Sequence, residues 1–487
     1  MENEQQNIEP TKLKRELKVA DAAAFSVGLI GPVGVMALLG AGAASMLGGG
    51  ATWAFIFALI AVALVAFGFV KLSRHISHTG SVYATVGLTL GPRAGFIAGW
   101  SLLLGYVTIG AGSGIEIGLF VTQLFKGLGI AFDPDWIGTA LVALALVVIL
   151  GRREVHTITR LLLFAELIGA VLVVILDLVI FFRVGTGTAP SGQAFSWDFL
   201  SLPSGTDISI IAGAAVFGFL AFAGFEGAAT LGEETSNPKR DIPRAIKIAI
   251  VVVGAFYLIT IIAQSLGYGL DAAGVKKFGA SSAPYADLAG AYVGPWLGHL
   301  LTLAAIFSLF AIFVGTMAGA ARVLFALARD SGTQTPLTRV SKHGAPTVAL
   351  TAVAVLALVV MLVIRSTNPA VLDGTFWALT IGTIALLVAY VLATVGAIRF
   401  LFFGKVASTP KWQIVVPILG LVLVFYTLYK NAVGLDAPYS WFPYMVVGWL
   451  LIGFVISFRK GLTSSIAGNL AAMNTPATDP REKVNEL

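Results

Sequence analysis

The chain is 487 residues long, 57% hydrophobic and only 11% charged. Soluble domains carry roughly 25% charged residues, so this composition predicts an integral membrane protein. The absence of cysteine excludes disulfides, thiol catalysis and thiolate metal sites. The net charge of +6 lies mostly in short segments between apolar runs, which predicts charge that sets membrane topology and argues against binding of nucleic acid.

The chain begins with a polar tail, 1–19, that lacks the apolar core of a cleaved signal peptide and is predicted to be cytoplasmic. After it come twelve apolar runs, and a membrane-spanning helix needs about 20 such residues. They predict an all-α membrane protein with twelve transmembrane helices. The expected spans are 20–46, 52–70, 94–124, 136–151, 160–182, 208–232, 245–270, 294–321, 346–364, 374–398, 412–430 and 440–458.

The connections between the spans differ sharply in charge. One set, together with both tails, holds 25 of the 31 lysines and arginines. Because cytoplasmic loops carry the excess of basic residues, both termini are predicted to be cytoplasmic in a multi-pass protein of the plasma (inner) membrane. The external segment 271–293 contains 281–290, interpreted either as a short helix across the outer mouth or as a surface loop. The cytoplasmic C-terminal tail, 461–487, is predicted to be disordered from residue 463.

The first predicted span is interrupted near its centre. Gly28, Gly31, Pro32 and Gly34 cluster there. A proline removes a backbone donor and opposes the preceding helical turn, yet it suits the first turn of a new helix. The pattern therefore predicts two half-helices that meet at this cluster.

The sixth predicted span is interrupted in a matching position. Its centre, 223–227, holds two glycines and Glu226, and a carboxylate at this depth is costly unless it faces protein, water or a ligand. The interruptions are five spans apart, an odd number. Spans 1–5 (20–185) and 6–10 (207–400) are therefore predicted to be inverted repeats, with spans 11 and 12 (411–460) appended.

Half-helices that start or stop inside a membrane present backbone groups to a ligand. The N–H groups of Val33, Gly34 and Val35 suit a carboxylate. The carbonyl groups that end the first half-helices suit an ammonium group, and an α-amino acid carries both groups. The alternative is that the glycines only allow tight helix packing. The carbonyl groups expected to accept are those of Leu29, Ile30, Ala221 and Phe222.

Three long motifs resemble the amino acid–polyamine–organocation transporter superfamily. Phe222–Pro243 looks like its span 6 with the following loop, Gly80–Trp100 like its span 2–3 connection, and Ala321–Pro346 like its span 8–9 connection. The resemblance covers about residues 20–400 and implies a LeuT-type 5+5 fold and an amino acid permease that works by alternating access. No cofactor, metal site or enzymatic activity is expected.

The resemblance also implies which residues line the substrate, although one motif departs from the family. The family carries Gly-Ser-Gly or Gly-Ala-Gly where this chain has Pro32-Val33-Gly34, so fewer donors face a carboxylate. The expected substrate-binding residues are Ile30, Gly31, Val33, Gly34, Val35, Tyr106, Ala221, Phe222, Ala223, Gly224 and Glu226.

Carboxyl groups inside the spans are candidates for ion coupling or gating. Burial disfavours the ionised form, so such a group can exchange a proton near neutral pH. Glu226 is the first candidate, and its alternative role is to hold the broken backbone. Glu166 and Glu116 are further candidates, whereas Asp177, nearer the outer end of its span, is expected to reach interfacial water.

The coupling ion is expected to be the proton, with sodium as the alternative. Sodium-coupled relatives use paired hydroxyls on span 8, but here Ser308 and Thr316 are eight residues apart. Some sodium-independent relatives place a lysine in span 5, where this chain has Gly169. Neither pattern is present, so exchange of one substrate for another stays open.

Aromatic residues near the interruptions are candidate lining or gating groups. They are Tyr106, Phe217, Phe222 and Trp377, and Trp377 is alternatively an interfacial anchor. No acid beyond Glu226 is placed to bind a cationic side chain, so a neutral, apolar amino acid is the expected substrate.

Functions of other classes compete with amino acid transport. A carrier of polyamines or other small amines and organic solutes fits the altered motif in span 1. A membrane enzyme would need a polar catalytic cluster, and the one candidate is His75, His78 and Arg74 at the predicted interface. No glycine-rich phosphate-binding loop with a lysine is present, which argues against ATP-driven pumping.

Overall fold

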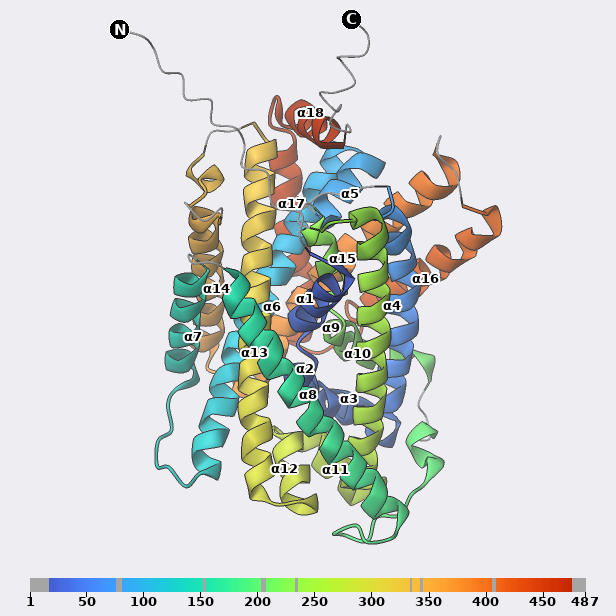
Figure 1. The fold of residues 1–487 in the computed structure, drawn as a ribbon, viewed down its shortest axis with the longest axis vertical. Coiled ribbons are helices and arrows are strands. Elements are labelled where there is room, and N and C mark those ends of the chain that lie inside the picture. Colours follow the sequence, from blue (N-terminus) through green and yellow to red (C-terminus); the bar gives the residue numbers. More distant parts are fainter. Residues whose placement is uncertain are drawn as a thin grey trace, which may run out of the picture.

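The protein is a bundle of long helices (Figure 1). The computed structural model describes residues 17–75, 81–151, 155–202, 207–232, 235–332, 335–341, 345–404 and 409–474. Across these ranges the regular structure is helical, with no β-strand. The predicted all-α class is therefore confirmed.

Within the described ranges, ten helices, counting the interrupted first one once, are long and apolar enough to cross a membrane. This supports the prediction of a multi-pass membrane protein. They are α1 (Val19–Ile30) with α2 (Pro32–Met36), α4 (Thr52–Leu72), α6 (Pro92–Gly127), α8 (Val155–Gly185), α10 (Pro238–Tyr268), α13 (Pro295–Asp330), α14 (Thr347–Thr367), α15 (Val371–Phe403), α16 (Val415–Lys430) and α17 (Phe442–Ser457).

The other two predicted spans contain shorter helices. They are α7 (Trp136–Leu150), with 15 residues, and α9 (Ile208–Ala221), with 14. A 15-residue helix rises only about 22 Å, less than the ~30 Å of a hydrocarbon core. After α9 the chain turns and continues as a 3₁₀ helix, η3 (Phe225–Leu231). The count of twelve spans stays a prediction.

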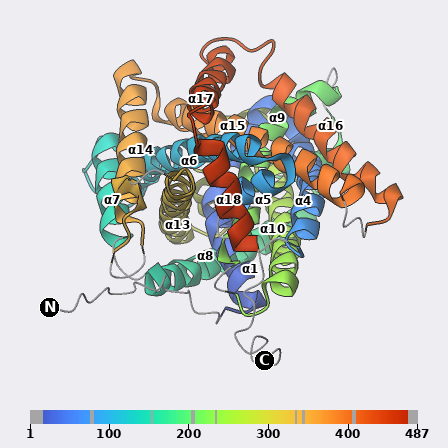
Figure 2. The ribbon, with the colours of Figure 1, turned by 90° about the horizontal axis from the view of Figure 1, so that it is seen from above.

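Short helices cover the two ends of the bundle. At one end α18 (Leu462–Asn474) packs on α5 (Ser81–Leu90) and α6, and Figure 2 shows α18 lying across that end. At the other end lie α3 (Leu39–Leu47), α11 (Ala272–Ala280) and α12 (Pro284–Tyr292) (Figure 1).

Two of these end-covering helices bear on the predictions. Between the two interpretations of 281–290, α12 confirms a short helix that starts at Pro284. The prediction of disorder from residue 463 is wrong for α18. Leu462, Ile466 and Leu470 recur every four residues and are buried, so this polar segment has one apolar stripe that packs on the bundle. The part of the predicted disordered tail after Asn474 lies outside the described residues.

Helix α6 runs through the centre of the bundle and packs along both α13 and α15. Its small residues allow these close approaches. Cβ atoms added at Gly110 and Gly112 would collide with Met317 of α13 and Leu379 of α15. The glycine-rich stretch of the third predicted span therefore serves helix packing, and it also places the side chains between the glycines against both neighbours.

Candidate functional site

The first interruption lies where it was predicted. Helix α1 ends at Ile30, Gly31 adopts a left-handed conformation (φ 61°, ψ 61°), and α2 begins at Pro32. A side chain at Gly31 would be strained in this conformation and would also collide with Ile312. Glycine and proline therefore dictate the break by local chemistry.

The second interruption also lies where it was predicted. Helix α9 ends at Ala221, and η3 begins after Gly224, which has a φ of 101°. The Ala221 carbonyl, predicted to be open to a ligand, accepts a hydrogen bond from the Tyr257 hydroxyl at 2.6 Å.

One hydroxyl group joins the two interrupted spans. The Ser26 Oγ atom of α1 accepts from the Ala228 N–H at 2.8 Å and donates to the Phe225 carbonyl at 3.3 Å. Ser26 is fully buried, so these bonds are made out of contact with solvent. This role of Ser26 was not predicted, because its partners lie about 200 residues away in the sequence.

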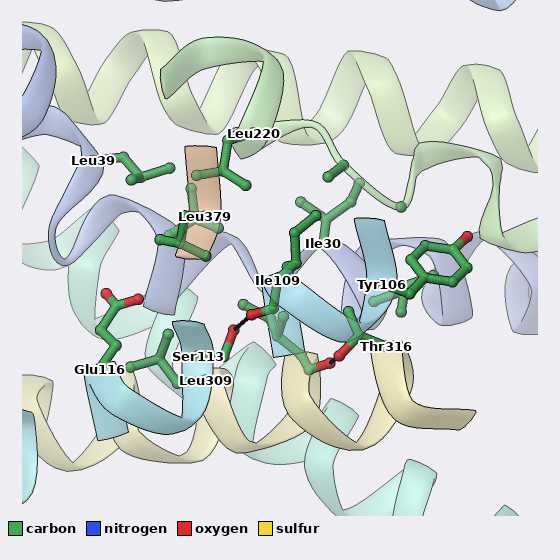
Figure 3. A pocket seen from close by; sticks show the side chains of 15 residues that line it. Ile30, Leu39, Tyr106, Ile109, Ser113, Glu116, Leu220, Leu309, Thr316 and Leu379 are labelled. Atoms are coloured by element: carbon green, nitrogen blue, oxygen red, sulfur yellow. Dashed lines mark hydrogen bonds between the residues drawn. The ribbon is translucent and has the colours of Figure 1, made fainter. Parts of the chain in front are cut away.

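A buried cavity lies between the two breaks (Figure 3). Nine of its lining residues have the larger aliphatic side chains of leucine, isoleucine or valine, so its wall is mainly apolar. Its polar side chains are those of Tyr106, Ser113, Glu116 and Thr316, and Glu116 and Tyr106 lie at opposite ends in Figure 3. The aliphatic residues are Leu29, Ile30, Val35, Leu39, Ile109, Leu220, Leu309, Ile312 and Leu379.

The residues predicted to bind substrate divide into two groups. Ile30, Val35, Tyr106, Ala223 and Gly224 line the cavity, as does the coupling candidate Glu116. The others lie beside the breaks but do not line the cavity. These are Gly31, Val33, Gly34, Ala221, Phe222 and Glu226.

The backbone donors at the start of α2 already have acceptors from the protein. The Val33 N–H donates to Oε1 of Glu166 and the Gly34 N–H to Oγ of Ser308, each at 2.9 Å. The Val35 N–H donates to the Gly31 carbonyl at 3.0 Å. The expectation that these three donors are open to a substrate carboxylate does not match this geometry, because a buried carboxyl and a hydroxyl occupy the first two.

Glu166 connects α8 to the start of α2. Its side chain is buried, and only one of its oxygens is used by Val33. The other, Oε2, has no hydrogen-bond partner among the described residues. This carboxyl group lies beside the Ser308 hydroxyl and combines a structural bond with a second oxygen that has no hydrogen bond within the described residues.

Glu226 has both carboxylate oxygens paired. Oε1 accepts from the Tyr106 hydroxyl at 2.9 Å and Oε2 from the Tyr390 hydroxyl at 2.7 Å. The rings of Phe69, Phe225 and Tyr390 pack on one another, with centroids 5.3–5.8 Å apart. Glu226 thus braces η3 against α6 and α15. We call Glu226 together with Tyr106 and Tyr390 the Glu226 clamp.

Glu116 and Asp177 have different surroundings. Glu116 lines the cavity, is buried, and its Oε1 has no hydrogen-bond partner among the described residues. Asp177 accepts from the Thr260 hydroxyl at 2.8 Å and is only 1% exposed. The expectation that Asp177 reaches interfacial water is therefore wrong, because α10 covers it.

Trp377 does not line the cavity. It packs beside a small cluster that includes Ile384, Phe442 and Val446. Its neighbour Phe376 instead meets Phe217 of α9, with ring centroids 5.3 Å apart. These two rings lie one turn before the cavity-lining Leu379 and Leu220. The gating role predicted for Trp377 stays untested.

Besides Ser26, three functional candidates were not predicted from the sequence: Phe376, Tyr390 and the Ser308 hydroxyl as a hydrogen-bond acceptor. Tyr390 left a weak signal, since it is a polar aromatic residue inside an apolar span. Ser308 stood out only as a possible sodium ligand. In the part of the chain that the structure describes, no group of three or more histidine, aspartate or glutamate residues is placed to hold an ion.

These features define a class of protein: a helical membrane protein in which two interrupted helices border a buried cavity. The sequence comparisons supply the family. The model of the amino acid permease family matches residues 17–455, and the chain belongs to this family. This confirms the amino acid permease resemblance, and the family is one of transporters.

Individual relatives differ in what they are named for. The chain is 27% identical over 358 residues to the branched-chain amino acid permease BcaP of Bacillus subtilis, covering 69% of this chain and 72% of the relative. It is 27% and 29% identical to the vacuolar cationic amino acid transporters 4 and 2 of Arabidopsis thaliana, covering 66% of this chain in each case. The matches span 54% and 50% of these plant relatives, about half of their length.

Proposed function

We propose that the protein is a secondary active transporter that moves amino acids across the plasma (inner) membrane by alternating access. The observation that carries this proposal is the buried cavity between two interrupted helices, together with membership of the amino acid permease family. Breaks in matching positions of two halves are typical of secondary transporters, with the substrate site beside them.

The proposed architecture has twelve spans. Residues 20–185 and 207–400 form two inverted repeats of five spans, and 411–460 supply the last two. The matching breaks in the first and sixth spans support this arrangement. The distribution of basic residues supports cytoplasmic termini, and the end covered by α5 and α18 is then the proposed cytoplasmic end.

The proposed substrate is a neutral amino acid with an apolar side chain. The mainly aliphatic wall supports this choice, because an apolar side chain gains free energy by leaving water for such a surface. The name of the bacterial relative points the same way, and the names of the plant relatives keep cationic amino acids as the competing class. Two further functions stay open: a carrier of amines that lack a carboxylate, and an amino acid exchanger.

Proton coupling is proposed to act through Glu166. An ionised Glu166 accepts from the Val33 N–H at the positive end of α2, and protonation at the free Oε2 removes the negative charge that favours this bond. Proton binding would thereby loosen α2 from α8. Glu226 fits a bracing role better, since both of its oxygens are already used.

Opening of the proposed cytoplasmic side would require the Glu226 clamp to rearrange. The clamp joins η3 to α6 and α15, two helices that line the cavity, so separating them breaks at least one bond from a tyrosine hydroxyl. Phe217 and Phe376 are the proposed counterpart on the outer side, because each lies one helical turn outward of a cavity-lining leucine.

Uptake into proteoliposomes tests the function. The purified protein is expected to accumulate at least one labelled neutral amino acid when the lumen is made alkaline relative to the outside. A sodium gradient at equal pH should give no accumulation. Failure to take up or exchange any member of a panel of the common amino acids would refute transport of amino acids.

A further inference from the structure

Glu116 is the charged side chain in the wall of the cavity. The other polar side chains of the wall have each used their hydrogen-bond donor. Ser113 and Thr316 donate to carbonyls of their own helices at 3.0 and 2.8 Å, and Tyr106 donates to Glu226. The Oε1 atom of Glu116 differs, because it has no partner among the described residues.

Among the described residues, no basic side chain lines the cavity to balance Glu116. None of the cavity-lining residues is a lysine, arginine or histidine. The ion pairs found among the described residues are all elsewhere, at Asp133, Asp135 and Asp330. An unpaired buried carboxylate is costly, and such a group in a cavity indicates a ligand that supplies what the protein does not.

The missing partner is a cation with N–H donors. A substrate carboxylate would find no free donor at the start of α2, because the Val33 and Gly34 N–H groups already donate to Glu166 and Ser308. The cavity thus has an unused acceptor at Glu116, while the donors expected to bind a carboxylate are occupied. A primary ammonium group supplies donors and the balancing charge, and the lone pairs of the nearby Ser113 hydroxyl can take a second N–H.

We propose that Glu116 binds a primary ammonium group of the substrate and is the main determinant of polar recognition in the cavity. This rests on the proposed transport function. The group can come from two sources, the α-ammonium of a neutral amino acid or the side-chain ammonium of a cationic one. In either case the hydrocarbon part of the substrate packs on the aliphatic wall.

Competition with the wild-type protein tests the proposal without any substitution. Against uptake of the best labelled amino acid, 3-methylbutan-1-amine keeps an ammonium without a carboxylate, and 4-methylpentanoate keeps a carboxylate without an ammonium. The amine is expected to inhibit at least about tenfold more strongly, since charged hydrogen bonds contribute about 1.5–3 kcal/mol each. Leucine methyl ester and Nα-acetyl-lysine then distinguish the α-ammonium from the side-chain ammonium. Equal inhibition by the acid would overturn the proposal.

A substitution of Glu116 provides a second test of the proposal. Glu116→Gln should weaken inhibition by the amine at least about tenfold while leaving the weak effect of the acid unchanged. Glu116→Asp should fall between Gln and wild type, and the matched control Asp198→Asn, an exposed acid in the segment before α9, should behave as wild type.

Failure of the inference can be separated from failure of the proposed function. Binding of the amine is also measured without transport, as stabilisation of the purified full chain against heat. Amine-induced stabilisation that is unchanged in Glu116→Gln would refute the inference. An absence of amino acid uptake together with Glu116-dependent amine stabilisation would refute only amino acid transport.

Discussion

The two interrupted helices are held in different ways. At the first break, a carboxyl group from another helix, Glu166, bonds to the backbone and keeps one oxygen free. At the second break, the carboxyl group belongs to the broken segment itself, and both oxygens of Glu226 are paired with hydroxyls. We propose that this difference reflects two roles: the first arrangement changes when a proton binds to Glu166, whereas the second stays in place until the helices move apart.

The largest expected effect is on stability, and it comes from replacing the glycine whose left-handed backbone conformation each break requires. Gly31→Ala should lower the free energy of unfolding by about 2–5 kcal/mol, because it adds left-handed strain and a collision with Ile312. Gly224→Ala should act similarly beside Leu29. Denaturant unfolding of the purified protein in detergent measures both. Gly138→Ala on α7, where an added Cβ meets nothing, is the control, and equal losses in all three would contradict the argument.

The next largest effect tests the first break alone. Glu166→Gln keeps an oxygen that accepts from Val33 but cannot bind and release a proton. Accumulation driven by one pH unit should fall about tenfold, the factor that such a gradient of about 1.4 kcal/mol can supply, while exchange persists. Glu226→Gln is the comparison and should keep the pH dependence. Wild-type accumulation by Glu166→Gln would assign coupling elsewhere.

A smaller effect on transport is expected from the Glu226 clamp. Tyr390→Phe leaves Oε2 of Glu226 buried without a donor, at a cost of about 1–3 kcal/mol in stability. Thermal unfolding should show this loss, and uptake should be slower at every pH with an unchanged pH profile. Tyr429→Phe, an exposed residue on α16, is the matched control. A shifted pH profile in Tyr390→Phe would mean that the clamp itself takes part in coupling.

The smallest effect lies at the start of α9, the first half of the second interrupted span. Hydrogen bonds from the side chain of Ser209 and the backbone N–H groups of Ile210 and Ser209 hold the pKa of exposed Asp207 below its usual value. The lowered pKa means that this cap stabilises the folded protein above about pH 4 and is lost as the pH falls through the lowered pKa. Asp207→Ala should reduce the melting temperature slightly at pH 7, and this difference should shrink in acid.

The sequence predicted the features that depend on local interactions, and it missed those that depend on contacts between residues far apart in the chain. Both breaks were located correctly because Gly31, Pro32 and Gly224 act through their own backbone. The partners of Glu226 and Glu166 were not predicted, since they join helices more than a hundred residues apart. Periodicity in an apolar span also cannot show which of two adjacent aromatic residues packs on a neighbouring helix. The contact of Phe376, and not Trp377, with Phe217 was therefore not predicted.

The bridge made by Ser26 has a mechanical consequence. It fastens η3 to α1 through one acceptor and one donor bond, so a tilt of either segment carries the other with it. We therefore expect the two segments to move together during transport, with the backbone rotating at Gly31 and Gly224, where the helices are broken. Movement of one interrupted helix would then reach the other directly through Ser26.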